Sequence, residues 1–193
     1  MTLLALIRHA PTEWSAAGRL QGRADPALDP AVLPEWRLPP TLAGFRVITS
    51  PLRRAVETAR LLGVAAPAIE PRLAEMAWGA WEGRTLADLR ARLGPEMAAA
   101  EAAGLDFRPP GGESPRDVQH RLVPLMAELD EAGRATVAIT HKGVIRAVFA
   151  LATGWDMRGK PPARLSWSAA HLFRLGSDGV PAVERLNLPL EYP

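Results

Sequence analysis

Two histidines stand directly after apolar runs that have the composition of buried strands. Residues 3–7 lead through Arg8 to His9, and residues 137–140 lead directly to His141. Because ligands bind outside the carboxyl ends of strands in open α/β sheets, these two imidazoles are expected to face one pocket. Guanidinium groups bind anions, and an imidazole can serve as a nucleophile or a base. The spacing therefore predicts a catalytic pocket for an anion.

A third basic cluster follows another apolar run, in the sequence Ser50-Pro51-Leu52-Arg53-Arg54. The pattern predicts Ser50 as the N-cap and Pro51 as the first residue of a helix, so that both arginines occupy its first turn. A cation in that position is unfavourable by about 0.3 to 1 kcal/mol, whereas a bound anion would be favoured by the helix end and the guanidinium alike. We predict that Arg54 lines the pocket and that Arg53 is solvated.

Composition narrows the class of protein. A chain of 193 residues with 48% hydrophobic residues can bury one core, which favours a single domain spanning residues 1–193. Because 23 Lys and Arg residues face 21 Asp and Glu residues, we expect no broad basic face and no nucleic-acid partner. With no cysteine, four histidines and no tight acidic cluster, the sequence predicts neither a metal site nor a cofactor. The N-terminal apolar run is too short for a signal peptide or a membrane span, so we expect a cytoplasmic protein with no membrane partner.

The elements alternate as they do in layered α/β folds. Three segments have the composition of strands in a mostly parallel sheet: residues 3–7, 45–49 and 136–140. Helical patterns follow the second and third of them, at residues 51–62 and 143–152. Near the end of the chain, residues 169–175 and 180–186 flank a Gly-Ser-Asp-Gly turn and predict a closing hairpin.

Between residues 76 and 113 the pattern changes to short helical pieces, at 86–93 and 96–103, which we interpret as a cap insertion over the sheet. Ser114 then predicts the N-cap of a long helix with Pro115 at its first position. Aromatic residues of the cap fit either a wall for the substrate or ordinary core packing.

The order of these motifs resembles the histidine phosphatase superfamily, also called phosphoglycerate-mutase-like. The motifs that carry the resemblance are Arg8-His9-Ala10-Pro11-Thr12-Glu13-Trp14, Leu20-Gln21-Gly22, Ser50-Pro51-Leu52-Arg53-Arg54-Ala55, Arg72-Leu73-Ala74-Glu75 with Gly79 and Trp81-Glu82-Gly83, Gly111-Gly112-Glu113-Ser114, and Thr140-His141. The resemblance implies a three-layer α/β sandwich with a mostly parallel central sheet flanked by helices and a short helical cap.

The resemblance also implies roles for individual residues. His9 would attack phosphorus to form a phosphohistidine, which divides one displacement into two steps. Arg8, Arg54 and His141 would hold the phosphoryl oxygens on which charge develops. Glu75 would act as the general acid for the leaving group and then as the base for water.

For several other positions, the resemblance implies a less specific role. Glu82 is the alternative general acid, while Thr12 and Gln21 would donate hydrogen bonds to the phosphate or to its ester oxygen. Ala10 and Lys142 occupy the places after the two histidines, where the family commonly has glycine. Lys142 is a cation at a helix N-terminus, and we hypothesise that it extends the pocket toward a second negative group of the substrate.

These expectations favour a metal-independent phosphomonoesterase acting on small-molecule phosphate esters of the sugar, nucleoside or α-ribazole phosphate type. A short cap lets water reach the phosphohistidine, which is the reason for preferring hydrolysis to phosphoglycerate mutase-type transfer. A non-catalytic, phosphate-binding regulatory relative is the other alternative. The physiological substrate stays open, and so does a homodimer formed through the edge strand of the hairpin.

Overall fold

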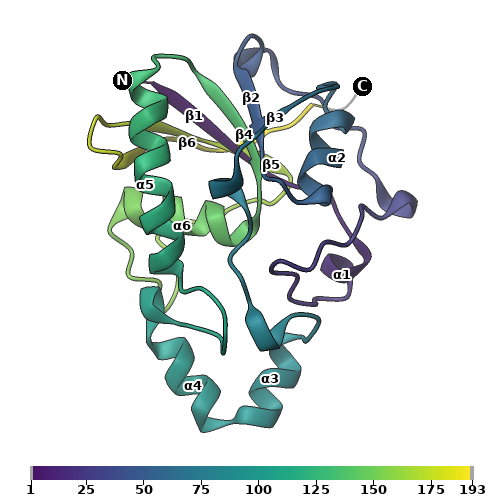
Figure 1. Cartoon of the computed structure of the whole chain (residues 1–193), viewed down its shortest axis with the longest axis vertical. Helices are drawn as coiled ribbons and strands as arrows, with labels where there is room; N and C mark the ends of the chain where they lie inside the picture. The colour runs from purple at the N-terminus through teal and green to yellow at the C-terminus, as the bar shows by residue number, and fades with distance from the viewer. Residues whose placement is uncertain (1, 192–193) are drawn as a thin grey trace.

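The computed structural model describes residues 2–191, which form one six-stranded sheet with helices on both faces (Figure 1). The strands are β1 (Leu3–Arg8), β2 (Arg46–Thr49), β3 (Ala68–Ile69), β4 (Thr136–Thr140), β5 (Ala169–Leu175) and β6 (Pro181–Pro189). Their order is β3-β2-β4-β1-β5-β6. Strands β1 to β4 are mutually parallel, and β5 and β6 add an antiparallel hairpin at one edge. The predicted mostly parallel sheet and its closing hairpin are therefore confirmed.

The helices divide between the two faces of the sheet. α5 (Pro115–Glu131) and α6 (Lys142–Thr153) cover one face, and α2 (Arg53–Leu61) covers the other (Figure 1). Because successive side chains of a strand point to opposite faces, Leu4 and Leu6 pack in the core beneath α5 and α6, while Ala5 and Ile7 pack in the core beneath α2. A strand buried on both faces needs a continuous apolar run, which explains residues 3–7. The three-layer α/β sandwich predicted above is confirmed.

The carboxyl ends of the central strands bring the two histidines together. Arg8 pairs with Thr140 in the parallel register of β1 and β4, and the next amide, that of His9, donates to the carbonyl of Thr140 at 2.9 Å. The amide of Ser50 donates to the carbonyl of Ile139 at 2.9 Å and ends β2 at the same edge. Residues far apart in the sequence therefore meet because their strands end at one level.

Residues from about 76 to 113 extend away from the sheet as a cap, at the lower end of Figure 1. The cap carries α3 (Leu86–Leu93) and α4 (Pro95–Ala102). Its base is closed by hydrogen bonds from the Glu113 amide to the Ala77 carbonyl at 2.9 Å and from the Ala80 amide to the Pro110 carbonyl at 3.0 Å. Gly79 has a φ of 50°, and a Cβ there would lie 2.2 Å from the Pro110 carbonyl oxygen, so only glycine fits this closure.

Short elements complete the chain between these layers. They are α1 (Glu13–Ala16) and the 3₁₀ turns η1 (Pro30–Val32), η2 (Pro40–Leu42), η3 (Pro71–Leu73), η4 (Gly79–Trp81) and η5 (Gly104–Asp106). Ser114 caps α5 through a hydrogen bond from the amide of Asp117, as predicted. Within residues 2–191, no helix has the length and apolar character needed to cross a membrane.

One helix boundary was predicted wrongly. α2 begins at Arg53, with Leu52 as a cap residue that makes no side-chain hydrogen bond, whereas the sequence predicted Ser50 as the N-cap and Pro51 as the first helical residue. The Ser50 hydroxyl accepts from the Leu52 amide at 3.3 Å and also lies 2.7 Å from Nε2 of His141, so the local hydrogen bond is present although the helix begins two residues later than predicted. The two arginines still occupy the first turn, as predicted.

Candidate active site

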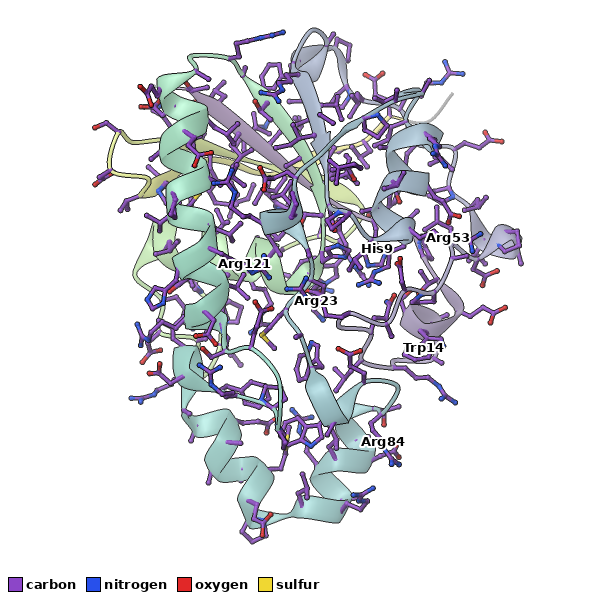
Figure 2. The ribbon with its side chains drawn as sticks, in the orientation of Figure 1. His9, Trp14, Arg23, Arg53, Arg84 and Arg121 are labelled. Atoms are coloured by element: carbon purple, nitrogen blue, oxygen red, sulfur yellow. The ribbon has the colours of Figure 1, made fainter. Side chains whose placement is uncertain are left out.

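A pocket of about 520 Å³ opens where the strand ends meet the cap. Its walls come from the end of β1, the loop after α1, the segment that follows η3, the cap, and the first turns of α6. Figure 2 shows His9 near the middle of the molecule, between the sheet layers and the cap helices, with Trp14 on α1 at its outer side. The predicted convergence of residues at the carboxyl edge of the sheet is thus what the structure contains.

His9 is held as a neutral imidazole with one nitrogen free. It is 4% exposed, and its Nδ1 lies 2.7 Å from the Ala10 carbonyl oxygen. Because a carbonyl can only accept, Nδ1 carries the proton and Nε2 carries the lone pair. Burial, followed by the charges of Arg8 and Arg54, lowers the pKa of His9 from 6.5 to about 3. The ring therefore stays uncharged and nucleophilic at ordinary pH.

The loop after His9 is anchored to α2 through Thr58. The Ala10 amide donates to the Thr58 hydroxyl at 2.9 Å, and this hydroxyl donates to the Arg54 carbonyl at 2.7 Å. Ala10 is fully buried, so the methyl group that replaces the family's usual glycine fits without opening the loop. The nucleophile is therefore fixed relative to Arg54 by a backbone connection.

Three buried side-chain nitrogens near His9 have no hydrogen-bond partner among residues 2–191: Arg8 Nε, Arg54 Nε and His141 Nδ1. The other nitrogens of the fully buried Arg54 are used, because they donate to the carbonyls of Ala24 at 2.7 Å and Gly22 at 2.9 Å. Burial, His9 and Arg54 together lower the pKa of His141 well below its usual value. Since buried polar groups are normally hydrogen-bonded, unpartnered nitrogens from three separate elements indicate a missing acceptor such as a phosphoryl group.

Glu75 lines the same pocket and is held by two backbone amides. It is 8% exposed; Oε1 accepts from the Met76 amide at 2.8 Å and Oε2 from the Gly143 amide at 3.2 Å. A Cβ at Gly143 would lie only 2.4 Å from Oε1 of Glu75. The first turn of α6 therefore approaches the carboxylate closely because residue 143 is glycine.

The backbone that carries Glu75 is fixed from behind. Arg121, which projects from α5 toward the centre of the molecule in Figure 2, donates to the carbonyl oxygens of Arg72 and Ala74. The Thr140 hydroxyl donates to the Leu73 carbonyl at 2.8 Å. A side chain of α5 and a side chain of β4 thus hold the segment in place.

Four of the predicted site residues are not among those that line the pocket: Arg54, His141, Glu82 and Thr12. The carboxylate of Glu82 accepts from the backbone amides of Arg23, Ala24 and Trp78, at 2.8, 2.9 and 3.1 Å. Thr12 is fully buried, and its hydroxyl caps α1 and donates to Oε1 of Gln21 at 3.1 Å.

Gln21 itself lines the pocket. Through its hydrogen bond, Thr12 orients Gln21 on this wall. Glu82 supports the loop whose carbonyls bind Arg54, because it accepts from the amides of Arg23 and Ala24.

The cap contributes an apolar wall and an ion pair. Met76, Trp78 and Phe107 line the pocket, and the rings of Trp78 and Phe107 meet edge-on at 5.5 Å. At the mouth, Arg90 of α3 and Glu101 of α4 pair at 2.7 Å. Both interpretations of the aromatic residues thus hold in part, since Trp78 and Phe107 also pack against the main core.

The sequence interpretation missed four residues that shape the site: Ser50 as the partner of His141, Thr58, Arg121 and Gly143. Only Gly143 carried a local signal, because a glycine in the first turn of a helix is unfavourable and needs a reason. The other three act through hydrogen bonds to residues between 47 and 91 positions away. Within residues 2–191, no group of three or more His, Cys, Asp or Glu side chains could hold a metal ion.

Comparison with known proteins identifies the family. The sequence profile of the histidine phosphatase superfamily, branch 1, matches residues 4–188. Glucosyl-3-phosphoglycerate phosphatase of Mycobacterium tuberculosis is 33% identical over 165 residues, covering 76% of this chain and 73% of its own. A 2,3-bisphosphoglycerate-dependent phosphoglycerate mutase of Azorhizobium caulinodans is 29% identical over 200 residues, covering 95% and 97% of the two chains.

The solved structures agree with this result. The native structure of a mycobacterial glucosyl-3-phosphoglycerate phosphatase superimposes with a TM-score of 0.73 at 27% identity, covering 98% of this chain and all of the other. The chain described here belongs to the histidine phosphatase superfamily. The predicted class of enzyme, a phosphoric monoester hydrolase, is confirmed by its phosphatase relatives.

Proposed function

We propose that this enzyme hydrolyses small phosphate monoesters, without a metal ion, through a phosphohistidine formed at Nε2 of His9. The observation that carries the proposal is the buried, uncharged imidazole with its free nitrogen beside three unpartnered nitrogens. A neutral nucleophile faces no repulsion from the surrounding guanidinium groups. The guanidinium groups then supply the charge that a metal ion would otherwise provide.

In the first step, Nε2 of His9 attacks phosphorus while the bond from phosphorus to the ester oxygen breaks. Glu75, protonated at this stage, gives its proton to the leaving oxygen, so the alcohol departs neutral. Arg8 and Arg54 neutralise the transferred phosphoryl group. The N–H at Nδ1 of His141 donates a hydrogen bond to one of the phosphoryl oxygens. Ser50 supports that tautomer because its hydroxyl can donate to Nε2 of His141.

In the second step, a water molecule attacks the phosphohistidine. The Glu75 carboxylate takes a proton from this water, the bond from phosphorus to nitrogen breaks, and inorganic phosphate leaves. The two amides that bind Glu75 keep its carboxylate on the pocket wall, where it can serve both steps. Glu82 fits this role less well, because three amides occupy its oxygens behind the wall.

The mouth of the pocket favours hydrolysis over mutase transfer. Arg19, Arg90 and Lys142 line the pocket and are exposed, so water reaches its interior between the sheet and the cap. A mutase must instead exclude water from its phosphohistidine. Bisphosphate-dependent exchange between 2- and 3-phosphoglycerate, faster than phosphate release, would favour the mutase alternative.

The decisive experiment combines turnover with trapping. The purified enzyme is mixed with a ³²P-labelled monoester, quenched in base within milliseconds because phosphohistidine is labile in acid, and mapped by peptide analysis. We expect label on the peptide containing His9 and none in His9→Asn. Steady phosphate release without label at His9 would refute the covalent mechanism, and absence of release from every monoester would favour the phosphate-binding regulatory alternative.

The substrate class, location and assembly belong to the same proposal. Glucosyl-3-phosphoglycerate, the compound in the name of the mycobacterial relative, joins sugar, nucleoside and α-ribazole phosphates as a substrate to test. We place the enzyme in the cytoplasm, where phosphate monoesters made inside the cell are retained because a phosphate dianion does not cross a bilayer unaided. We propose no nucleic-acid partner. Sedimentation would decide whether the β6 edge forms a homodimer.

A further inference from the structure

The pocket holds more positive charge than one phosphoryl group requires. Beyond Arg8, the first two turns of α6 place Lys142 and Arg146 on the pocket wall. These residues are four apart, so they lie on one face of the helix. Arg146 is four residues, or about 6 Å along the helix axis, farther from His141 than Lys142 is. The two cations therefore continue the pocket away from the nucleophile.

Neither cation has an acidic partner. Among the described residues, Lys142 and Arg146 form no ion pair, and each is instead placed against an indole ring. Lys142 Nζ lies 5.2 Å from the ring centre of Trp167, and the Arg146 guanidinium lies 5.0 Å from that of Trp155. Other arginines of this chain do find carboxylates, as Arg90 does at the mouth of the same pocket. Lys142 and Arg146 are therefore two neighbouring cations on the pocket wall whose charge no carboxylate of the described residues offsets through an ion pair.

The electrostatic setting of Lys142 agrees with an absent anion. Burial, Arg8 and Arg146 each lower the pKa of Lys142, and Glu75 opposes them as the weakest influence. Neighbouring like charges that are partly withdrawn from water raise the free energy of the unliganded pocket. An anion bound among them would remove that cost.

The indole of Trp167 fixes where the anion would sit. Trp167 is half-buried and lies against both Lys142 and Arg8, whose guanidinium carbon is 6.0 Å from the ring centre. Its loop is held to β6 by Asn187, which accepts from the Ser166 amide at 2.6 Å and donates to the Arg164 carbonyl at 2.9 Å. The ring thus restrains two flexible cations and leaves their charged ends available to the pocket.

We propose that Lys142 and Arg146 form a second anion subsite, so that preferred substrates are phosphate monoesters carrying a carboxylate or a second phosphate. This inference rests on the proposed function of His9 for the orientation of the substrate. The phosphoryl group occupies the nitrogens around His9, and the second group is bound along the first turns of α6. Charge at two places then selects the substrate and its direction of entry.

The test compares substrates that differ only in the second group. 3-Phosphoglycerate and glycerol 3-phosphate differ by a carboxylate in place of a hydroxymethyl group, and fructose 1,6-bisphosphate and fructose 6-phosphate differ by one phosphate. We expect kcat/KM to favour the more anionic member of at least one pair. Lys142→Ala should lower that ratio about 10- to 100-fold, mainly through KM, because a charge-assisted hydrogen bond is lost.

Matched variants separate this effect from general loss of charge. Lys142→Arg should keep most of the preference and Arg146→Ala should reduce it, whereas Lys160→Ala, which removes an exposed lysine that does not line the pocket, should leave it unchanged. No preference in either pair, or equal losses for both members of each pair in Lys142→Ala, would overturn the subsite.

A binding arm keeps the subsite distinct from the proposed catalysis. Calorimetry with His9→Asn measures the dissociation constants of 3-phosphoglycerate, glycerol 3-phosphate and the two fructose phosphates without turnover. A preference for an anionic member that disappears in the double variant with Lys142→Ala supports the subsite even if hydrolysis fails. Hydrolysis at His9 without any such preference would leave the function standing and refute the subsite.

Discussion

Replacing Gly143 by alanine should impair proton donation by Glu75 without harming the fold. Ordinary van der Waals contact begins at 3.4 Å, whereas the new Cβ would lie 2.4 Å from Oε1 of Glu75, so the carboxylate must move by about 1 Å. A misplacement of that size costs on the order of 100-fold in rate. Gly143 lies in α6 and does not have a positive φ, so alanine should stabilise the helix by up to about 0.5 to 1 kcal/mol. We therefore expect kcat for an alkyl phosphate to fall about 100-fold while the melting temperature stays level or rises.

The assay distinguishes the general acid from other causes by varying the leaving group. p-Nitrophenolate leaves without much help from an acid, so Gly143→Ala should slow p-nitrophenyl phosphate hydrolysis far less than glycerol 3-phosphate hydrolysis. In the Glu75→Ala background, Gly143→Ala should add little further loss, since both changes act on one group. Equal losses for the two substrates, or additive losses in the double variant, would refute the reasoning.

Three further expectations follow from the same contacts. Between pH 6.5 and about 3 the unfolded His9 binds a proton that the folded His9 does not, so the free energy of unfolding should decrease as the pH is lowered, by up to about 1.4 kcal/mol per pH unit. In His9→Asn, the free energy of unfolding measured in urea should depend less steeply on pH between pH 7 and 5. An unchanged slope would contradict the low pKa of His9. Glu82→Gln and Glu75→Gln should each cost about 1 to 3 kcal/mol of stability by turning an amide toward a backbone donor, whereas Glu75→Gln alone should also remove the proton donor and so cause the larger loss of activity in the folded enzyme. Phosphatase activity should survive EDTA, and loss that a divalent ion restores would show that the metal-independent mechanism is wrong.

The arrangement around Arg54 shows how a fold can hold a cation cluster together. Arg54 is fully buried, and two backbone carbonyls and a contact of 3.6 Å to Asp25 offset its charge. Glu82 in turn binds the loop that supplies those carbonyls. The positive charge of the pocket is therefore stabilised from behind, which leaves its front to the substrate.

Much of the architecture could be predicted because short sequence patterns reflect the burial of strands and the capping of helices. The double-sided burial of β1 demands a continuous apolar run, and a serine followed by proline begins α5 through an N-cap. The same reasoning placed His9 and His141 at one edge, since parallel strands end at a common level. It failed at Ser50, which binds the Leu52 amide and also His141, while α2 begins only at Arg53.

The sequence by itself determined the fold class, the strand ends and the set of side chains able to handle a phosphoryl group. Only the tertiary structure distinguishes the positions of Glu75 and Glu82, which stand seven residues apart on one segment: Glu75 lines the pocket and Glu82 does not. The approach of Gly143 keeps one carboxylate on the pocket wall, while the loop at residues 22–24 holds the other behind it. Pairing between segments that are distant in the chain depends on how the layers pack, and no local pattern encodes that packing.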